Sequence, residues 1–155
     1  MKEARLLPRL EAWAQEELGA QQALLRALEA HERSLGRGTP EEIETTVRAI
    51  GEVDPRGSAR RGELDAILRE LAAAWKLASG TLTLGSVAER FEERGARLAR
   101  LRTELRRAVV EVRERSRRVA LVSRQQCAIV SKVLETVLGK DGLEGIRGAV
   151  VDSRA

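Results

Sequence analysis

The chain has 155 residues, of which 43% are hydrophobic and 34% are charged, and its formal net charge is +4. This length suits one domain, and the hydrophobic content excludes a chain that is disordered because of low hydropathy. Its single cysteine, Cys127, excludes an internal disulfide framework and is typical of a reducing compartment. No run of about twenty uncharged apolar residues occurs, and acidic residues interrupt the beginning of the chain. We therefore expect a cytoplasmic protein without a membrane span or signal peptide.

The composition predicts an all-α fold. Leu, Ala, Arg and Glu dominate, whereas the aromatic residues are only Trp13, Trp75 and Phe91. No stretch of sufficient length shows the alternation of apolar and polar residues that a strand requires. The mixture is typical of long helices or coiled coils. We expect an antiparallel bundle or coiled coil of long helices, with short middle helices and an extended C-terminal helix.

The first half of the chain is predicted to form two helices. Leucines at steps near three and four indicate a first helix over Glu3–Leu35, which Gly36 and Gly38 end. The sequence Thr39-Pro40-Glu41-Glu42 then restarts a helix, because threonine caps, proline fits the first turn, and glutamate completes a capping box. This second helix is expected to end near Gly51.

The second half is predicted to form a shorter helix over Ala59–Ala78 and a long last helix capped by Thr83. From Leu84 to Val137 the apolar residues recur with a mean period near 3.5, as in a coiled-coil seam. Such a helix needs a long neighbour, and the first helix is the expected antiparallel partner. We predict a single helical domain over residues 1–139 and a flexible C-terminal tail over residues 140–155.

The positive charge is concentrated in one segment. Residues 1–93 carry 13 basic and 17 acidic side chains, whereas residues 94–124 carry 11 basic and 3 acidic ones. The segment from Arg94 to Arg124 has a net charge of +8, which is 11 minus 3. A solvated outer helix face accounts for such a run, and attraction to nucleic acid or anionic membrane is the alternative.

The sequence offers no arrangement of residues for catalysis. His31 is the only histidine, and Cys127 has no histidine within a turn of its helix, so a metal site or an activated nucleophile is not expected. We expect a structural or surface role for His31 and a small, partly buried core position for Cys127. No phosphate-binding glycine loop is present. The prediction is a protein that is not an enzyme and has no cofactor.

The last predicted helix changes character after Arg124. Charged residues become rare, and apolar residues follow at helical spacing in "CAIVSKVLETVLG". Two interpretations stay open. Either this stretch packs on Leu6, Leu10 and Trp13 of the first helix, or it is kept for a partner.

The arrangement resembles the FlgN-type flagellar export chaperones. The similarity lies in "LLRALEAHERSL", "GELDAILRELAAAW", "TLTLGSVAERF" and "LRTELRRAVVEVRERSRRVALVSRQQCAIVSKVLETVLG". It implies a cytoplasmic chaperone that binds the C-terminal segment of hook–filament junction (hook-associated) proteins before their secretion through the flagellar type III apparatus. It also implies contact with export-apparatus components, and self-association is a further possibility. The contact residues that the resemblance implies are Val122, Ile129, Val130, Val133, Leu134, Val137 and Leu138.

The alternative function is a basic coiled-coil adaptor. Its Arg94–Arg124 segment would contact nucleic acid or an anionic membrane. No aromatic residue follows Phe91, whereas single-strand binding proteins interleave aromatic residues for base stacking. Nucleic acid and membrane are therefore not the expected partners.

Overall fold

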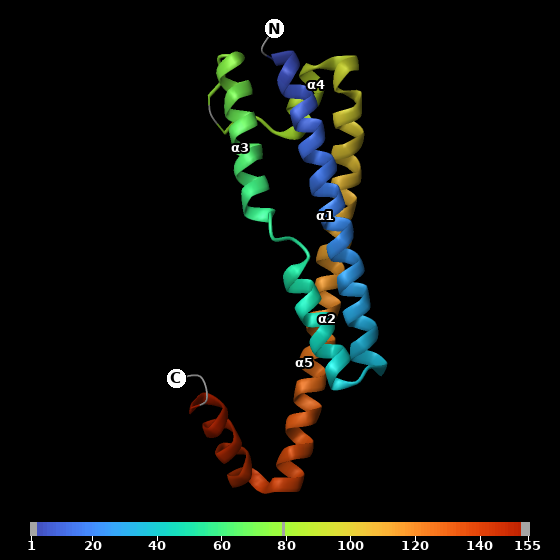
Figure 1. The fold of residues 1–155 in the computed structure, drawn as a ribbon, viewed down its shortest axis with the longest axis vertical. Coiled ribbons are helices and arrows are strands. Elements are labelled where there is room, and N and C mark those ends of the chain that lie inside the picture. The colour runs from blue at the N-terminus through green and yellow to red at the C-terminus, as the bar shows by residue number, and fades with distance from the viewer. Residues whose placement is uncertain (1–2, 79, 153–155) are drawn as a thin grey trace. The chain divides into compact units, whose positions relative to one another are not determined.

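The computed structural model describes the backbone of residues 3–78 and 80–152 and the side chains of residues 5–78 and 80–137. All regular elements of these residues are helical, which confirms the all-α prediction. In chain order they are α1 (Glu3–Arg37), α2 (Pro40–Glu52), α3 (Gly57–Ala74), α4 (Leu84–Arg90), the 3-10 helix η1 (Glu92–Gly95) and α5 (Ala96–Asp152) (Figure 1). The chain forms two compact units, Met1–Ser116 and Arg117–Ala155.

Two helices begin at the caps that the sequence predicted. At the start of α2, the Thr39 hydroxyl accepts from the Glu42 amide, and the Glu42 carboxylate accepts from the Thr39 amide at 2.9 Å. At the start of α4, Thr83 and Ser86 form the same reciprocal pair. Each pair satisfies two amides that would otherwise lack a partner in the first turn.

The predicted continuous helix from Thr83 onward is wrong, because the chain breaks between α4 and α5. Glu92, the first residue of η1, adopts a φ of 50°, in the left-handed region. At Gly95 the backbone passes so close to Ala88 that a Cβ atom would overlap the Ala88 carbonyl oxygen. The glycine therefore permits the close turn by which α4 folds back against the start of α5.

The helices of the first unit do not pair in the predicted direction. Contacts between His31 and Thr46 and between Glu17 and Arg60 show that α2 and α3 run back along α1. Arg97 of α5 then lies 3.7 Å from Glu11, and Arg115 lies 2.6 Å from Glu32. From the first of these pairs to the second, the residue number increases in both helices. The first helix and the start of α5 are therefore parallel, not antiparallel (Figure 1). The two middle helices cause this, since together they return the chain to the end where α1 began.

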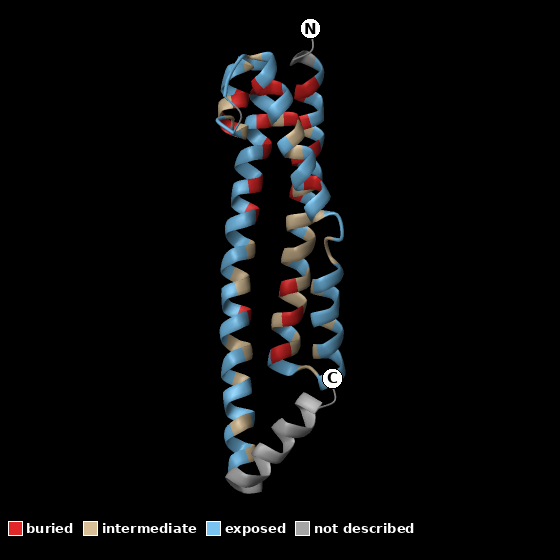
Figure 2. Cartoon of the chain, turned by 90° about the vertical axis from the view of Figure 1, so that its left-hand side faces the viewer, coloured by how far each residue is buried: buried red, intermediate tan, exposed pale blue. Residues whose placement is uncertain are grey.

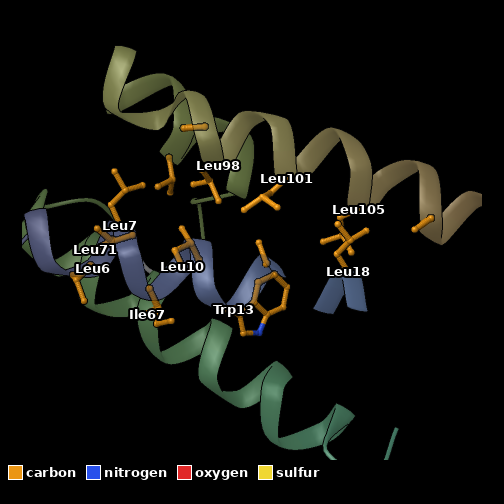
Figure 3. Close-up of a cluster of buried hydrophobic side chains, with 14 residues drawn as sticks. Leu6, Leu7, Leu10, Trp13, Leu18, Ile67, Leu71, Leu98, Leu101 and Leu105 are labelled. Carbon is orange, nitrogen blue, oxygen red and sulfur yellow. The ribbon is translucent and has the colours of Figure 1, made fainter. Parts of the chain in front are cut away.

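The core of the first unit lies where α1, α3, α4 and the start of α5 meet (Figure 2). Leu10, Leu71, Val87 and Leu98 are its most deeply buried side chains. Figure 3 shows leucines of α1 and α5 facing one another, with Ile67 and Leu71 of α3 beside them; the labelled residues are Leu6, Leu7, Leu10, Trp13, Leu18, Ile67, Leu71, Leu98, Leu101 and Leu105. Burial of apolar side chains at this junction is the main stabilising contribution to the unit.

The second unit consists of the rest of α5. The helix continues through Gly139 to Asp152, whereas the sequence predicted that it would end near Gly139. The predicted flexible tail over residues 140–155 stays a prediction, and residues 153–155 lie outside the described residues. Within the described part of the chain, no helix combines the length and the apolar character needed to cross a membrane.

Candidate partner-binding surface

The apolar stretch that follows Arg124 is largely exposed to solvent. The exposed fractions are 63% for Ile129, 56% for Val130, 54% for Val133 and 73% for Val137. Val122 and Leu134 are half-buried. The side chain of Leu138, the last predicted contact residue, lies outside the described residues. The predicted surface thus contains four large apolar side chains that are more than half exposed.

These residues share one side of α5. At about 100° per residue, Ile129, Val133 and Val137 fall within about 80° of one another, and Val130 and Leu134 widen this arc to about 140°. Lys132 and Glu135 lie outside the arc. We call the described residues Val122, Ile129, Val130, Val133, Leu134 and Val137 the apolar stripe. It offers anchors at i, i+4 and i+8, which is the pattern by which one helix packs along another.

The residues of α1 that one interpretation of the sequence assigned as partners of this stretch are packed within the first unit. Leu6, Leu10 and Trp13 are buried in the core of the first unit, among residues of α3, α4 and the start of α5. The Trp13 indole also donates a hydrogen bond of 2.7 Å to the Arg60 carbonyl. The α1 surface that would have received the stripe is therefore already occupied.

Most of the arginine-rich segment is exposed, as expected for a solvated helix face. Exposed arginines occur at 94, 97, 100, 102, 106, 107, 113, 117, 118 and 124. Arg115 is different, because only 26% of its side chain is exposed and it bonds to α1. The segment is therefore not uniform, because Arg115 is partly buried in its contact with α1.

Arg115 joins α5 to two carboxylates of α1. Its guanidinium donates to Glu32 at 2.6 Å and to Glu29 at 3.1 Å. The hydrogen bond with Glu32 raises the pKa of Arg115 above its usual value, and burial opposes that shift. The sequence interpretation missed this role, because it treated Arg115 as one of the charges of a solvated helix face. A signal was present, because Arg115 continues the 3-4 spacing of Leu101, Leu105 and the other seam residues, where a charge requires a partner from the facing helix.

Arg60 forms a second ion-pair cluster that sequence reasoning missed. It is buried, and its guanidinium lies 2.9 Å from Glu17 and 2.7 Å from Asp54. The hydrogen bond to Asp54 raises the pKa of Arg60, and the same bond lowers the pKa of the Asp54 carboxyl. This cluster joins α1 to the start of α3 and has no sequence signal, because Arg60 lies among several similar basic residues.

The remaining candidates for chemistry have no catalytic surroundings. His31 is buried, and its Nδ1 lies 2.9 Å from the Thr46 hydroxyl, which fits a structural role. Cys127 is exposed, so the prediction of a partly buried core position is wrong. The described residues contain no group of three or more side chains arranged to hold a metal ion.

No protein-family model, no curated protein and no solved structure matches this chain.

Proposed function

We propose that this chain is a cytoplasmic, non-enzymatic export chaperone of the FlgN type. Its cargo would be the C-terminal segment of hook-associated flagellar proteins, held until secretion. The observation that carries the proposal is the exposure of the apolar stripe along the later part of the long last helix. An exposed contiguous apolar surface in a highly charged protein is typical of an interaction site.

The chemistry of the stripe fits an amphipathic helix of the cargo. Anchors at helical spacing recognise apolar side chains at matching spacing on the partner. Valine and isoleucine have few rotamers, so they lose little conformational entropy when a partner covers them. The exposed arginines that precede the stripe keep the helix soluble while the stripe is free.

Isothermal titration calorimetry tests the proposal directly. The full chain is titrated with the C-terminal segments of hook–filament junction proteins encoded in the same genome. We expect saturable binding with a negative heat-capacity change, which is the signature of apolar burial. A control segment with its apolar residues changed to serine is expected not to bind. If none of the junction proteins binds, the proposal is wrong.

The rival function is a basic adaptor that contacts nucleic acid or anionic membrane through the Arg94–Arg124 segment. Exposure of most of its arginines is the observation that favours it. Binding by phosphate neutralisation would weaken steeply as salt concentration rises. Apolar docking would be insensitive to salt or slightly strengthened by it. Titrations at two salt concentrations, with an oligonucleotide and with anionic vesicles as alternative ligands, distinguish the two functions.

A further inference from the structure

A second surface with different chemistry lies in the first unit, where α3 and α4 end. A groove of about 510 Å³ is lined by Ala74, Trp75, Lys76, Arg90, Phe91 and Arg94. We call it the cationic–aromatic groove. It combines two half-buried aromatic rings with three exposed basic side chains, and no acidic side chain lines it.

The rings and one guanidinium hold one another in place. The ring centroids of Trp75 and Phe91 are 5.5 Å apart, with the planes inclined by 56°. The Cζ atom of Arg90 lies 4.8 Å from the centroid of the Trp75 ring. Stacking on a ring restricts a guanidinium and leaves its in-plane N–H groups available to an acceptor.

The three cations of the groove lack acidic partners. Lys76, Arg90 and Arg94 form no ion pair within the described part of the chain, whereas Arg9, Arg60 and Arg115 do. Convergence of three such charges costs free energy unless an anion compensates it. The groove is thus complementary in charge to an acidic ligand.

The backbone at the groove is in an uncommon conformation. Lys76 and Glu92 have φ values of 53° and 50°, and they are the non-glycine residues of positive φ in the described chain. Each directly follows a groove aromatic that caps a helix. After Trp75, the amides of Lys76 and Leu77 bond to the carbonyls of Ala73 and Ala72, which is the arrangement that usually has glycine at the Lys76 position.

The side chain of Lys76 is exposed to solvent, although its backbone adopts a strained conformation. Non-glycine residues in the left-handed region concentrate at ligand sites, where the side chain is needed despite the strain. A lysine in place of glycine places a cation at the edge of the groove. The strained backbone at Lys76 therefore indicates the same kind of ligand as the charge of the groove.

We propose that the cationic–aromatic groove binds an acidic peptide segment of a partner protein. The Arg90 guanidinium can donate two N–H groups to a carboxylate, and Lys76 and Arg94 provide further charge for neighbouring acidic residues. Phe91 and Arg90 already contact the Trp75 ring, on which a nucleotide base would have to stack, and this favours a peptide over single-stranded nucleic acid. This site lies outside the apolar stripe and does not depend on the proposed chaperone function.

Fluorescence anisotropy with the full chain tests the proposal. The probe is a short labelled peptide in which Glu alternates with Leu, and its counterpart carries Gln in place of Glu. We expect the double variant Lys76→Gln, Arg94→Gln to bind the Glu peptide about tenfold more weakly, because it loses two charge-assisted contacts. The matched variant Arg100→Gln, Arg106→Gln removes two exposed arginines of α5 and is expected to change affinity by less than about twofold.

Three outcomes of this experiment would overturn the proposal. The first is that the Gln peptide binds as tightly as the Glu peptide, and the second is that the two double variants lose the same affinity for the Glu peptide. The third is that the Lys76→Gln, Arg94→Gln variant loses binding of an oligothymidine probe but keeps binding of the Glu peptide. Circular dichroism establishes that each variant is folded.

The variant Lys76→Gly provides an independent readout. Glycine relieves the left-handed backbone and removes the cation, so we expect a higher melting temperature together with weaker binding of the Glu peptide. A purely structural lysine would give the opposite result, a lower melting temperature and unchanged peptide binding, and that result would contradict the proposal.

Discussion

Introducing charge into the apolar stripe is expected to abolish cargo binding without unfolding the protein. The perturbation is the double substitution Val133→Asp, Val137→Asp. The two valines are 54% and 73% exposed, so a partner can still remove more than half of their surface from water. Full burial of such a side chain contributes about 1.5–3 kcal/mol, and the part that remains available therefore contributes about 1–2 kcal/mol for each valine.

These contributions convert into a large loss of affinity. Two valines account for about 2–4 kcal/mol, which corresponds to about 30-fold to 1,000-fold in Kd. The introduced carboxylates would also have to be desolvated against an apolar partner, which adds to the loss. We expect cargo affinity to fall by at least about a hundredfold. Because the valines are exposed, the melting temperature should stay within a few degrees of the parent.

A matched variant separates the effect of the position of the new charges from the effect of the charge itself. Leu121→Asp, Ala128→Asp adds the same two charges to exposed positions of α5 on the side opposite the apolar stripe. This control should bind cargo within about threefold of the parent, since exposed substitutions away from a contact have small effects. Calorimetry and thermal melting are measured on both variants. A folded Val133/Val137 variant with normal cargo binding would refute the assignment of the stripe, and an unfolded one would show that these valines belong to a core.

Three further predictions concern the first unit. Arg115→Gln leaves two carboxylates of α1 without their cation and should lower the free energy of unfolding by about 1–2 kcal/mol in urea titrations, whereas Arg117→Gln should change it by less than about 0.5 kcal/mol. The folded-state pKa of Asp54 is lowered by its bond to Arg60, so its contribution to stability is present above about pH 4 and is lost as pH falls through the folded pKa; Asp54→Asn should reduce the acid dependence of the urea midpoint, and an unchanged dependence would contradict this assignment. Gly95→Ala should destabilise by about 1–3 kcal/mol because its Cβ meets the carbonyl of the preceding helix, whereas Gly51→Ala, which meets nothing within 4 Å, should not lower the melting temperature.

Local signals in the sequence predicted the elements well. Thr39 and Thr83 begin α2 and α4 because their hydroxyls compete effectively for the first amides of a helix, and this chemistry needs only neighbouring residues. The all-α class followed from residue composition and spacing in the same way. Such features are local in sequence, so they are readable before the fold is known.

The relative direction of the helices and the burial of their side chains depend on residues far apart in the sequence, so both were harder to predict. The parallel course of α1 and α5 results from the two middle helices carrying the chain back, and no residue within either long helix encodes it. Arg115 appeared to be one charge among many, yet its place on the seam turned it into a contact with Glu29 and Glu32. Similarly, the exposure of Val133 could not be deduced from its own neighbours, because a core helix and a docking helix share the same apolar spacing.

The two proposed surfaces belong to different compact units and respond oppositely to salt. Raising the salt concentration screens the charges of Lys76, Arg90 and Arg94, so an acidic peptide should be released from the cationic–aromatic groove. The same change favours burial of apolar side chains, so a cargo helix should stay on the apolar stripe. Each surface can therefore be assayed in the presence of the other without mutation. Cargo binding that weakened in step with acidic-peptide binding would mean that both ligands use the charged surface, and it would favour the basic adaptor over the chaperone.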